Sequence, residues 1–182
     1  MAITKIQSES LNLADDYAFT GTITGAGGIT EADQWRLTGA IDFVQDTATL
    51  ISTSFERVDT GGFNYIGTGM TQSSGIFSFP STGIWLIEFN GMTQGGGSDY
   101  IVGQIKTTTN NSTYSTASQA ITFSTASSRY GNFNCKFIFD VTDISTHKVA
   151  FYQYKQDTAT IYLNGSTSRN DTHFTFIRLG DT

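Results

Sequence analysis

The residues that could carry out chemistry in this chain are few and scattered. His147 and His173 are the only histidines, and neither belongs to an HExxH motif or a His-rich pair that would hold zinc. The single cysteine, Cys135, lies in an alternating apolar run, which predicts a buried and unreactive thiol. The chain contains no Gly-x-Ser-x-Gly elbow, no phosphate-binding loop and no Cys-x-x-Cys pair. The sequence therefore predicts neither catalytic residues nor a cofactor, and we expect a protein that is not an enzyme.

The carboxylates do not form a metal motif either. Asp15 and Asp16 are adjacent, and Asp140 and Asp143 frame a predicted turn, but no group has the alternating spacing of a calcium loop. Turn and capping roles are favoured over a calcium site assembled from surface loops. The glycine clusters at 25–28 and 95–97 precede no predicted helix, so they are expected to be hinges rather than phosphate cradles.

Charge excludes several kinds of partner. Only 14% of the residues are charged, against the roughly 25% that is usual for soluble domains, and the net charge is −6. The ten basic residues are scattered, so no patch is available for nucleic acid or for an anionic membrane. No apolar stretch reaches the length of a membrane-spanning helix, and the first residues lack the pattern of a signal peptide. We expect synthesis in a cytoplasm and no membrane insertion.

The elements that must position any site are strands. Short alternating apolar runs recur between turn residues, and Thr, Phe and Tyr are abundant, which is typical of an all-β sandwich or barrel. The only proline, Pro80, ends one such run, and Gly83 lets the backbone turn into the next. The alternation predicts a core that contains Trp85, Ile87, Phe89, Phe137, Phe139 and Phe151.

The segment "TGMTQSSGIFSFPSTGIWLIEFNGM" resembles the central signature of the complement globular-head domain, a tumour-necrosis-factor-like (TNF-like) jelly roll. The closing "HFTFIRLG" is similar to the last strand of that family, and the resemblance covers about residues 31–182. It implies an all-β, two-sheet antiparallel jelly-roll sandwich that assembles as a homotrimer. The chain departs from the vertebrate form in having no collagen stalk. The matching positions of the signature are Gly75, Phe77, Pro80, Gly83 and Trp85.

Two late strands carry aromatic residues on faces that the pattern places outside the core. Exposed apolar patches of this kind usually mark an interface. The resembled family places these two strands along its threefold axis, which implies that their aromatic side chains form the trimer interface. The predicted interface residues are Tyr152, Tyr154, Phe174 and Phe176.

The beginning of the chain has a different character. "ITKIQSESLNLADDYAFTGTITGAGG" resembles the N-terminal pieces and linkers of bacteriophage fibre proteins, particularly those of marine cyanophages. This resemblance implies an attachment arm with a glycine-rich linker at 1–28 and a jelly-roll head at 29–182. The alternative is that 1–28 is the first strand of the head with a fraying tail. The apolar residues assigned to the arm are Ile3, Ile6, Leu11, Leu13, Tyr17 and Phe19.

The two resemblances together imply a structural protein of a phage virion, assembled in the host cytoplasm. It would be a trimeric capsid-decorating, short-fibre or knob protein whose arm docks on a capsid or tail protein. The alternative is the receptor- or glycan-binding tip of a tail fibre, with a host-surface glycan as partner. An enzyme, such as a surface hydrolase, is the least favoured class because no catalytic motif is present.

Overall fold

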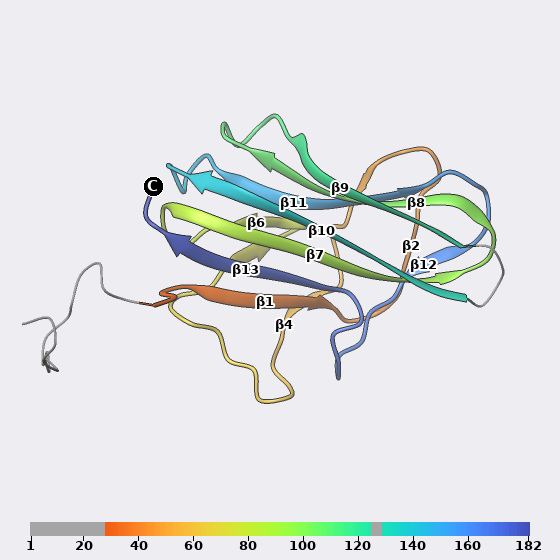
Figure 1. Cartoon of the computed structure of the whole chain (residues 1–182), viewed down its shortest axis with the longest axis horizontal. Coiled ribbons are helices and arrows are strands. Elements are labelled where there is room, and N and C mark those ends of the chain that lie inside the picture. The colour runs from red at the N-terminus through yellow and green to blue at the C-terminus, as the bar shows by residue number, and fades with distance from the viewer. Residues whose placement is uncertain (1–27, 125–128) are drawn as a thin grey trace, which may run out of the picture.

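A computed structural model of the chain describes residues 28–124 and 129–182, and these form two β-sheets packed face to face (Figure 1). All regular elements of these residues are strands, and no helix among them has the length and apolarity needed to span a bilayer. The strands are β1 (Ala32–Leu37), β2 (Ile41–Asp42), β3 (Thr49–Leu50), β4 (Phe55–Arg57), β5 (Thr71–Ser73), β6 (Ile76–Ser78), β7 (Gly83–Gly95), β8 (Ser98–Thr108), β9 (Ser115–Ser124), β10 (Arg129–Val141), β11 (Lys148–Lys155), β12 (Ile161–Leu163) and β13 (His173–Gly180).

The strand order confirms the predicted two-sheet antiparallel jelly-roll sandwich. The seven-stranded sheet has the order β2-β12-β7-β13-β1-β4, with β10 paired along the other edge of β7. The six-stranded sheet has the order β5-β6-β11-β8-β9, with β3 paired to β11. Every pairing between named strands is antiparallel. Consecutive strands β7 and β8 lie in different sheets, so the chain crosses between the layers as it runs.

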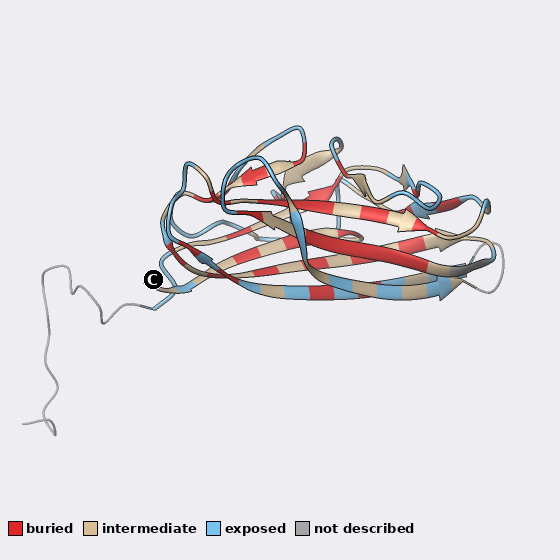
Figure 2. Cartoon of the chain, turned by 90° about the horizontal axis from the view of Figure 1, so that it is seen from above, coloured by how far each residue is buried: buried red, intermediate tan, exposed pale blue. Residues whose placement is uncertain are grey.

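Alternation along each strand places the core between the two sheets, and Figure 2 shows the resulting bands of buried and exposed residues. On β7, the residues at every second position from Gly83 to Thr93 are buried, while the residues between them are half-buried. The predicted core is confirmed for Trp85, Ile87, Phe89, Phe139 and Phe151. Phe137 packs against this core but is only partly buried, because β10 is an edge strand whose inner face is incompletely covered.

The structure corrects the expectation for Phe174 and Phe176. Both side chains are fully buried inside their own chain, so they are not available to a second chain. The cause is the register of β13, which places Phe174 beside Phe89 and Phe176 beside Ile87 on the inner face of the sheet. The ring of Phe174 lies 4.4 Å from that of Phe151 on the opposite sheet.

One aromatic ring sets the distance between the sheets near the end of β7. Phe133, on β10, is buried and pairs with Gly91 of β7, and its ring also covers Gly103 of β8. A Cβ atom at either glycine would overlap the Phe133 ring. Neither glycine needs an unusual backbone angle, so space alone requires a residue without a side chain there. Cys135 follows on the same face, and burial raises the pKa of its thiol to about 12, which agrees with the predicted unreactive thiol.

We expect Gly103→Ala to destabilise the fold, because the new methyl group must displace the Phe133 ring. Overpacking of this kind costs about 1–3 kcal/mol of unfolding free energy. Gly39→Ala is the matched control, since nothing lies within 4 Å of the position where its Cβ would stand. Urea denaturation of both variants measures the difference. Equal stability of the two variants would contradict the assigned role of Phe133.

Candidate functional site

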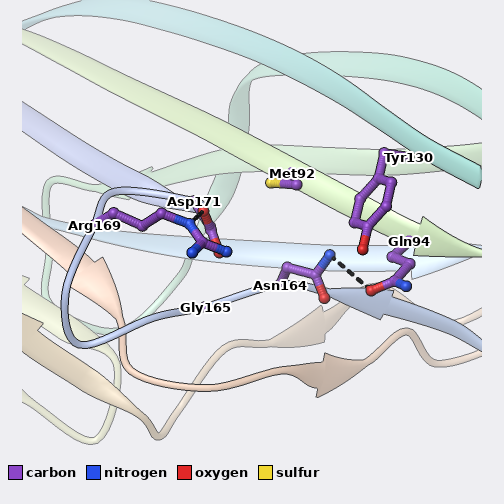
Figure 3. Close-up of a pocket in the computed structure, with 7 residues that line it drawn as sticks. All are labelled: Met92, Gln94, Tyr130, Asn164, Gly165, Arg169 and Asp171. Carbon is purple, nitrogen blue, oxygen red and sulfur yellow. Dashed lines mark hydrogen bonds and ion pairs between the residues drawn. The ribbon is translucent and has the colours of Figure 1, made fainter.

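A polar depression lies where β7 approaches its end, beside the start of β10 and the loop between β12 and β13 (Figure 3). Its volume is about 370 Å³. Two of its residues come from β7 and one from β10, and the other four belong to the loop. The lining residues are Met92, Gln94, Tyr130, Asn164, Gly165, Arg169 and Asp171.

The backbone of the loop between β12 and β13 is hydrogen-bonded to β7 and to the end of β1. The amide of Asn164 donates to the carbonyl of Met92 at 2.8 Å, and the amide of Ser166 donates to the carbonyl of Leu37 at 2.8 Å. Gly165 lies against the backbone of Leu37 and Gly39, where a Cβ atom would not fit. The depression therefore has a wall whose backbone position is fixed by main-chain contacts.

The side chains of the depression form two hydrogen-bonded pairs. Asn164 donates from Nδ2 to Gln94 Oε1 at 3.3 Å. Arg169 donates from Nε to Asp171 Oδ1 at 2.7 Å and from Nη2 to Asp171 Oδ2 at 3.2 Å. These hydrogen bonds, and the charge of Asp171, raise the pKa of Arg169 above its usual value. In Figure 3 the Tyr130 side chain points toward the Gln94–Asn164 pair.

The four predicted interface residues do not meet on one surface. Tyr152 and Tyr154 lie on β11 of the six-stranded sheet and are half-buried, whereas Phe174 and Phe176 lie in the core on the other sheet. Both tyrosines contact residues of their own chain. The Lys106 ammonium group lies 4.3 Å from the centre of the Tyr152 ring, and the ring of Tyr100 meets that of Tyr154 edge to face at 6.1 Å.

The predicted arm and its six apolar residues lie outside the described residues, apart from Gly28. The division of the chain at 28 therefore stays a prediction. Among residues 28–124 and 129–182, no group of three or more His, Cys, Asp or Glu side chains is placed to hold a metal ion.

An apolar row on the outer face of the seven-stranded sheet was not predicted from the sequence. Its members lie opposite one another on paired strands, in the order β10, β7, β13 and β1. The row ends in the loop that follows β4. Ile138 is 60% exposed at one end of the row and Ile66 is 46% exposed at the other. The signal was available, because Ile138 interrupts the otherwise polar outward positions of β10. The apolar row consists of Ile138, Leu86, Ile177, Ala32 and Ile66.

Buried charges hold the loop that contains Ile66. Asp33 is 2% exposed and accepts hydrogen bonds from Trp35 Nε1 at 2.9 Å, from Arg57 Nε at 3.1 Å and from the amide of Met70 at 2.8 Å. The Arg57 guanidinium group lies over the rings of both Trp35 and Tyr65. A charge buried without partners costs several kcal/mol, so removal of one partner from this network would destabilise the fold at this edge.

Arg36 is also buried, at 1% exposure, on the outer face of β1. It donates to Glu56 at 2.6 Å, to Asp59 at 2.7 Å and to Thr60 at 2.7 Å, and it also donates to the carbonyl of Thr167. These contacts connect the loop after β4 with the loop that lines the depression. The spacing of single charges in the sequence gave no sign of this arrangement, because its members are far apart along the chain.

His173 begins β13 beside Asn90 of β7, and its Nδ1 atom is buried without a hydrogen-bond partner among the described residues. Burial lowers the pKa of His173, and the charge of Glu88 and a hydrogen bond to the backbone of Asn170 offset part of that effect. Burial therefore favours the neutral form of the imidazole.

We expect acidification from about pH 7.5 to about pH 5.5 to lower the melting temperature. The pKa of His173 is lower in the folded chain than in the unfolded chain, so the unfolded chain binds more protons in this range. The stabilisation is complete above the unfolded pKa of about 6.5 and is lost as the pH falls below it. His173→Gln should flatten the dependence of melting temperature on pH. An unchanged slope in that variant would contradict the assignment.

The fold is a TNF-like jelly roll, and solved structures share it. Eiger, a TNF from S. frugiperda, matches with a TM-score of 0.61 and 12% identity over 85% of this chain and 96% of that chain. Murine APRIL at pH 8.0 matches with a TM-score of 0.57 and 13% identity over 82% and 98% of the two chains.

A viral structure has the same fold. The vertex protein P5 of the phage PRD1 matches with a TM-score of 0.53 and 15% identity, over 85% of this chain and all of that chain. No protein-family model and no curated protein matches the sequence. At these identities the comparisons establish the fold, which confirms the TNF-like jelly roll implied by the glycine, proline and aromatic signature at 75–85.

Proposed function

We propose that this protein is a homotrimeric structural component of a phage virion, either a capsid decoration or a short fibre or knob. The observation that carries the proposal is the apolar row on the outer face of a TNF-like sheet. The row is exposed at its two ends and half-buried between them, and apolar patches that reach the surface in this way are typical of contact surfaces. The shared fold of the PRD1 vertex protein supports a place on a virion.

The same chain has a second exposed apolar surface, on β9, that suits the apolar row as a contact surface. Ile121 and Phe123 are 60% and 67% exposed on β9, which is the edge strand of the six-stranded sheet. We propose that the β9 edge of one protomer packs on the apolar row of the next. When a surface of one chain packs on a different surface of the next identical chain, the assembly closes into a ring if the rotation between neighbours is a simple fraction of a full turn. A ring of three protomers buries every copy of both surfaces. Both sets of exposed side chains are then covered without leaving an open end.

We expect light scattering at micromolar concentration to return three times the 19.8 kDa mass of one chain. Ile138→Asp should dissociate the trimer, because it buries an unpaired carboxylate in each contact. Ile144→Asp is the matched control, since Ile144 is 43% exposed in the turn between β10 and β11 and lies outside the apolar row. A monomeric wild-type protein would contradict the proposal.

Tyr152→Asp distinguishes the two candidate interfaces. We expect this variant to stay trimeric, because Tyr152 lies on β11, which β8 separates from the β9 edge. Dissociation by Tyr152→Asp but not by Ile138→Asp would instead support the interface that the aromatic pattern predicted.

The proposed attachment to the particle uses residues 1–28. Among the described residues, the buried core cluster is formed by residues between Leu37 and Phe176. The chain enters the first strand at one end of the sandwich, where the C-terminus also lies (Figure 1). An arm that orders on a capsid or tail protein by adding a strand to a sheet edge would leave the rest of the head free.

We expect a chain without Met1–Gly28 to remain a trimer with a nearly unchanged melting temperature, yet to be absent from assembled particles. Calorimetry of the purified protein and the protein content of purified virions measure the two effects. A fall of about 10 °C in melting temperature, on the order of 2 kcal/mol for a chain of this length, would show that these residues belong to the head.

The alternative role is the receptor- or glycan-binding tip of a tail fibre. It uses the same fold and the same trimer, so neither separates the two roles. The number of copies per particle does, because a decoration is present in many copies and a tail fibre in few.

A further inference from the structure

We propose that the polar depression lined by Gln94, Tyr130, Asn164, Arg169 and Asp171 binds a neutral saccharide. This inference goes beyond the virion role proposed above and does not depend on it, because binding is measured on the purified protein. The depression lies toward the end of the sandwich opposite to the start of β1 (Figures 1 and 3). Its volume of about 370 Å³ is within the range of small-ligand sites, which begins at about 300 Å³.

The amide pair offers a donor and an acceptor side by side. The hydrogen bond between Asn164 Nδ2 and Gln94 Oε1 fixes the orientation of both amides. It leaves the Gln94 amino group as a donor and the Asn164 carbonyl oxygen as an acceptor, and neither has another partner among the described residues. A sugar hydroxyl donates one hydrogen bond and accepts others, so two neighbouring hydroxyl groups match this pair.

The charges argue against an anion. Arg169 supplies the positive charge of the depression, and its guanidinium group is already paired with Asp171 through two hydrogen bonds. The pair is neutral as a whole, and the chain carries a net charge of −6. A phosphate or sulfate would have to displace Asp171, whereas a hydroxyl group can donate to its carboxylate and accept from the free nitrogen of Arg169.

Tyr130 supplies the apolar part of the site. Its side chain is 62% exposed at the start of β10, and an aromatic ring offers a flat apolar face together with a hydroxyl group. The C–H face of a pyranose ring is apolar while its edge carries hydroxyl groups, so a saccharide satisfies both parts of this wall. A tyrosine has few rotatable bonds, so little conformational entropy is lost on contact.

The wall formed by the loop is preorganised. Gly165 lies against the backbone of Leu37 and Gly39, and main-chain hydrogen bonds hold Asn164 and Ser166. A site that is fixed before the ligand arrives loses less freedom on binding. The volume and the fixed loop wall of the depression therefore favour the binding of a small polar ligand.

Saturation-transfer NMR on the full-length protein tests the proposal. The probes are maltose, lactose, chitobiose and α-1,6-mannobiose, with inorganic phosphate as a competitor. We expect at least one disaccharide to receive saturation and phosphate to leave that signal unchanged. Titration of the binding disaccharide should show at least about a tenfold weaker affinity for Tyr130→Ala, which corresponds to about 1.4 kcal/mol, and a smaller loss for Tyr130→Phe.

Tyr162→Ala is the matched control. Tyr130 and Tyr162 are both exposed cross-strand neighbours of Gln94, on its two sides, but only Tyr130 lines the depression. Wild-type affinity in this variant supports the site. Saturation of none of the four disaccharides, displacement by phosphate, or an equal loss in Tyr162→Ala would each overturn the proposal. The virion role is judged separately by the trimer mass and by particle assembly, so one can fail while the other holds.

Discussion

The packing of the Phe133 ring against the backbone of two glycines determines how the other strands are arranged. Phe133 pairs with Gly91 of β7 and also covers Gly103 on the opposing sheet. A shift of β7 by one residue would place Asn90 or Met92 beneath the ring, where a side chain does not fit, and would turn every inward residue of β7 outward. The register of this long strand is therefore fixed by volume as well as by hydrogen bonds.

That register decides what each face of the sheet presents. With Gly91 beneath Phe133, the inward positions of β7 bring Phe89 against Phe174, and the outward positions bring Leu86 into the apolar row and Gln94 beside Tyr130. The core, the proposed contact surface and the proposed saccharide site thus share one strand. The buried Asp33 and Arg36 then fix the loops at the far edge of the sheet, including the loop that ends the row at Ile66.

Strand alternation and one signature segment were enough to predict the all-β fold and most of its core. Trp85, Ile87 and Phe89 were placed correctly because β7 is a central strand with cover along its whole inner face. The orientation of β13 was not predictable in the same way. Its sequence alternates aromatic residues with Thr175 and Ile177, so period alone does not say which set faces inward, and only the pairing with β7 decides it.

The candidate site could not be predicted from the sequence, for a different reason. Gln94, Tyr130 and Asn164 are ordinary polar residues that lie far apart along the chain, and no spacing rule connects them. Asp33 and Arg57 likewise meet only through the pairing of β1 with β4. The apolar row was accessible in principle, since Ile138 stands among outward polar positions, but its extent depends on a register across four strands and a bridge.

The single thiol of this chain has a practical consequence. Cys135 is 4% exposed on β10, two positions after Phe133, and its pKa of about 12 leaves almost no thiolate at neutral pH. Alkylating reagents therefore reach it when the edge strand β10 unpairs or the two sheets separate. The rate of its labelling reports how often the sandwich opens, both in the free protein and wherever the protein is mounted, without any introduced probe.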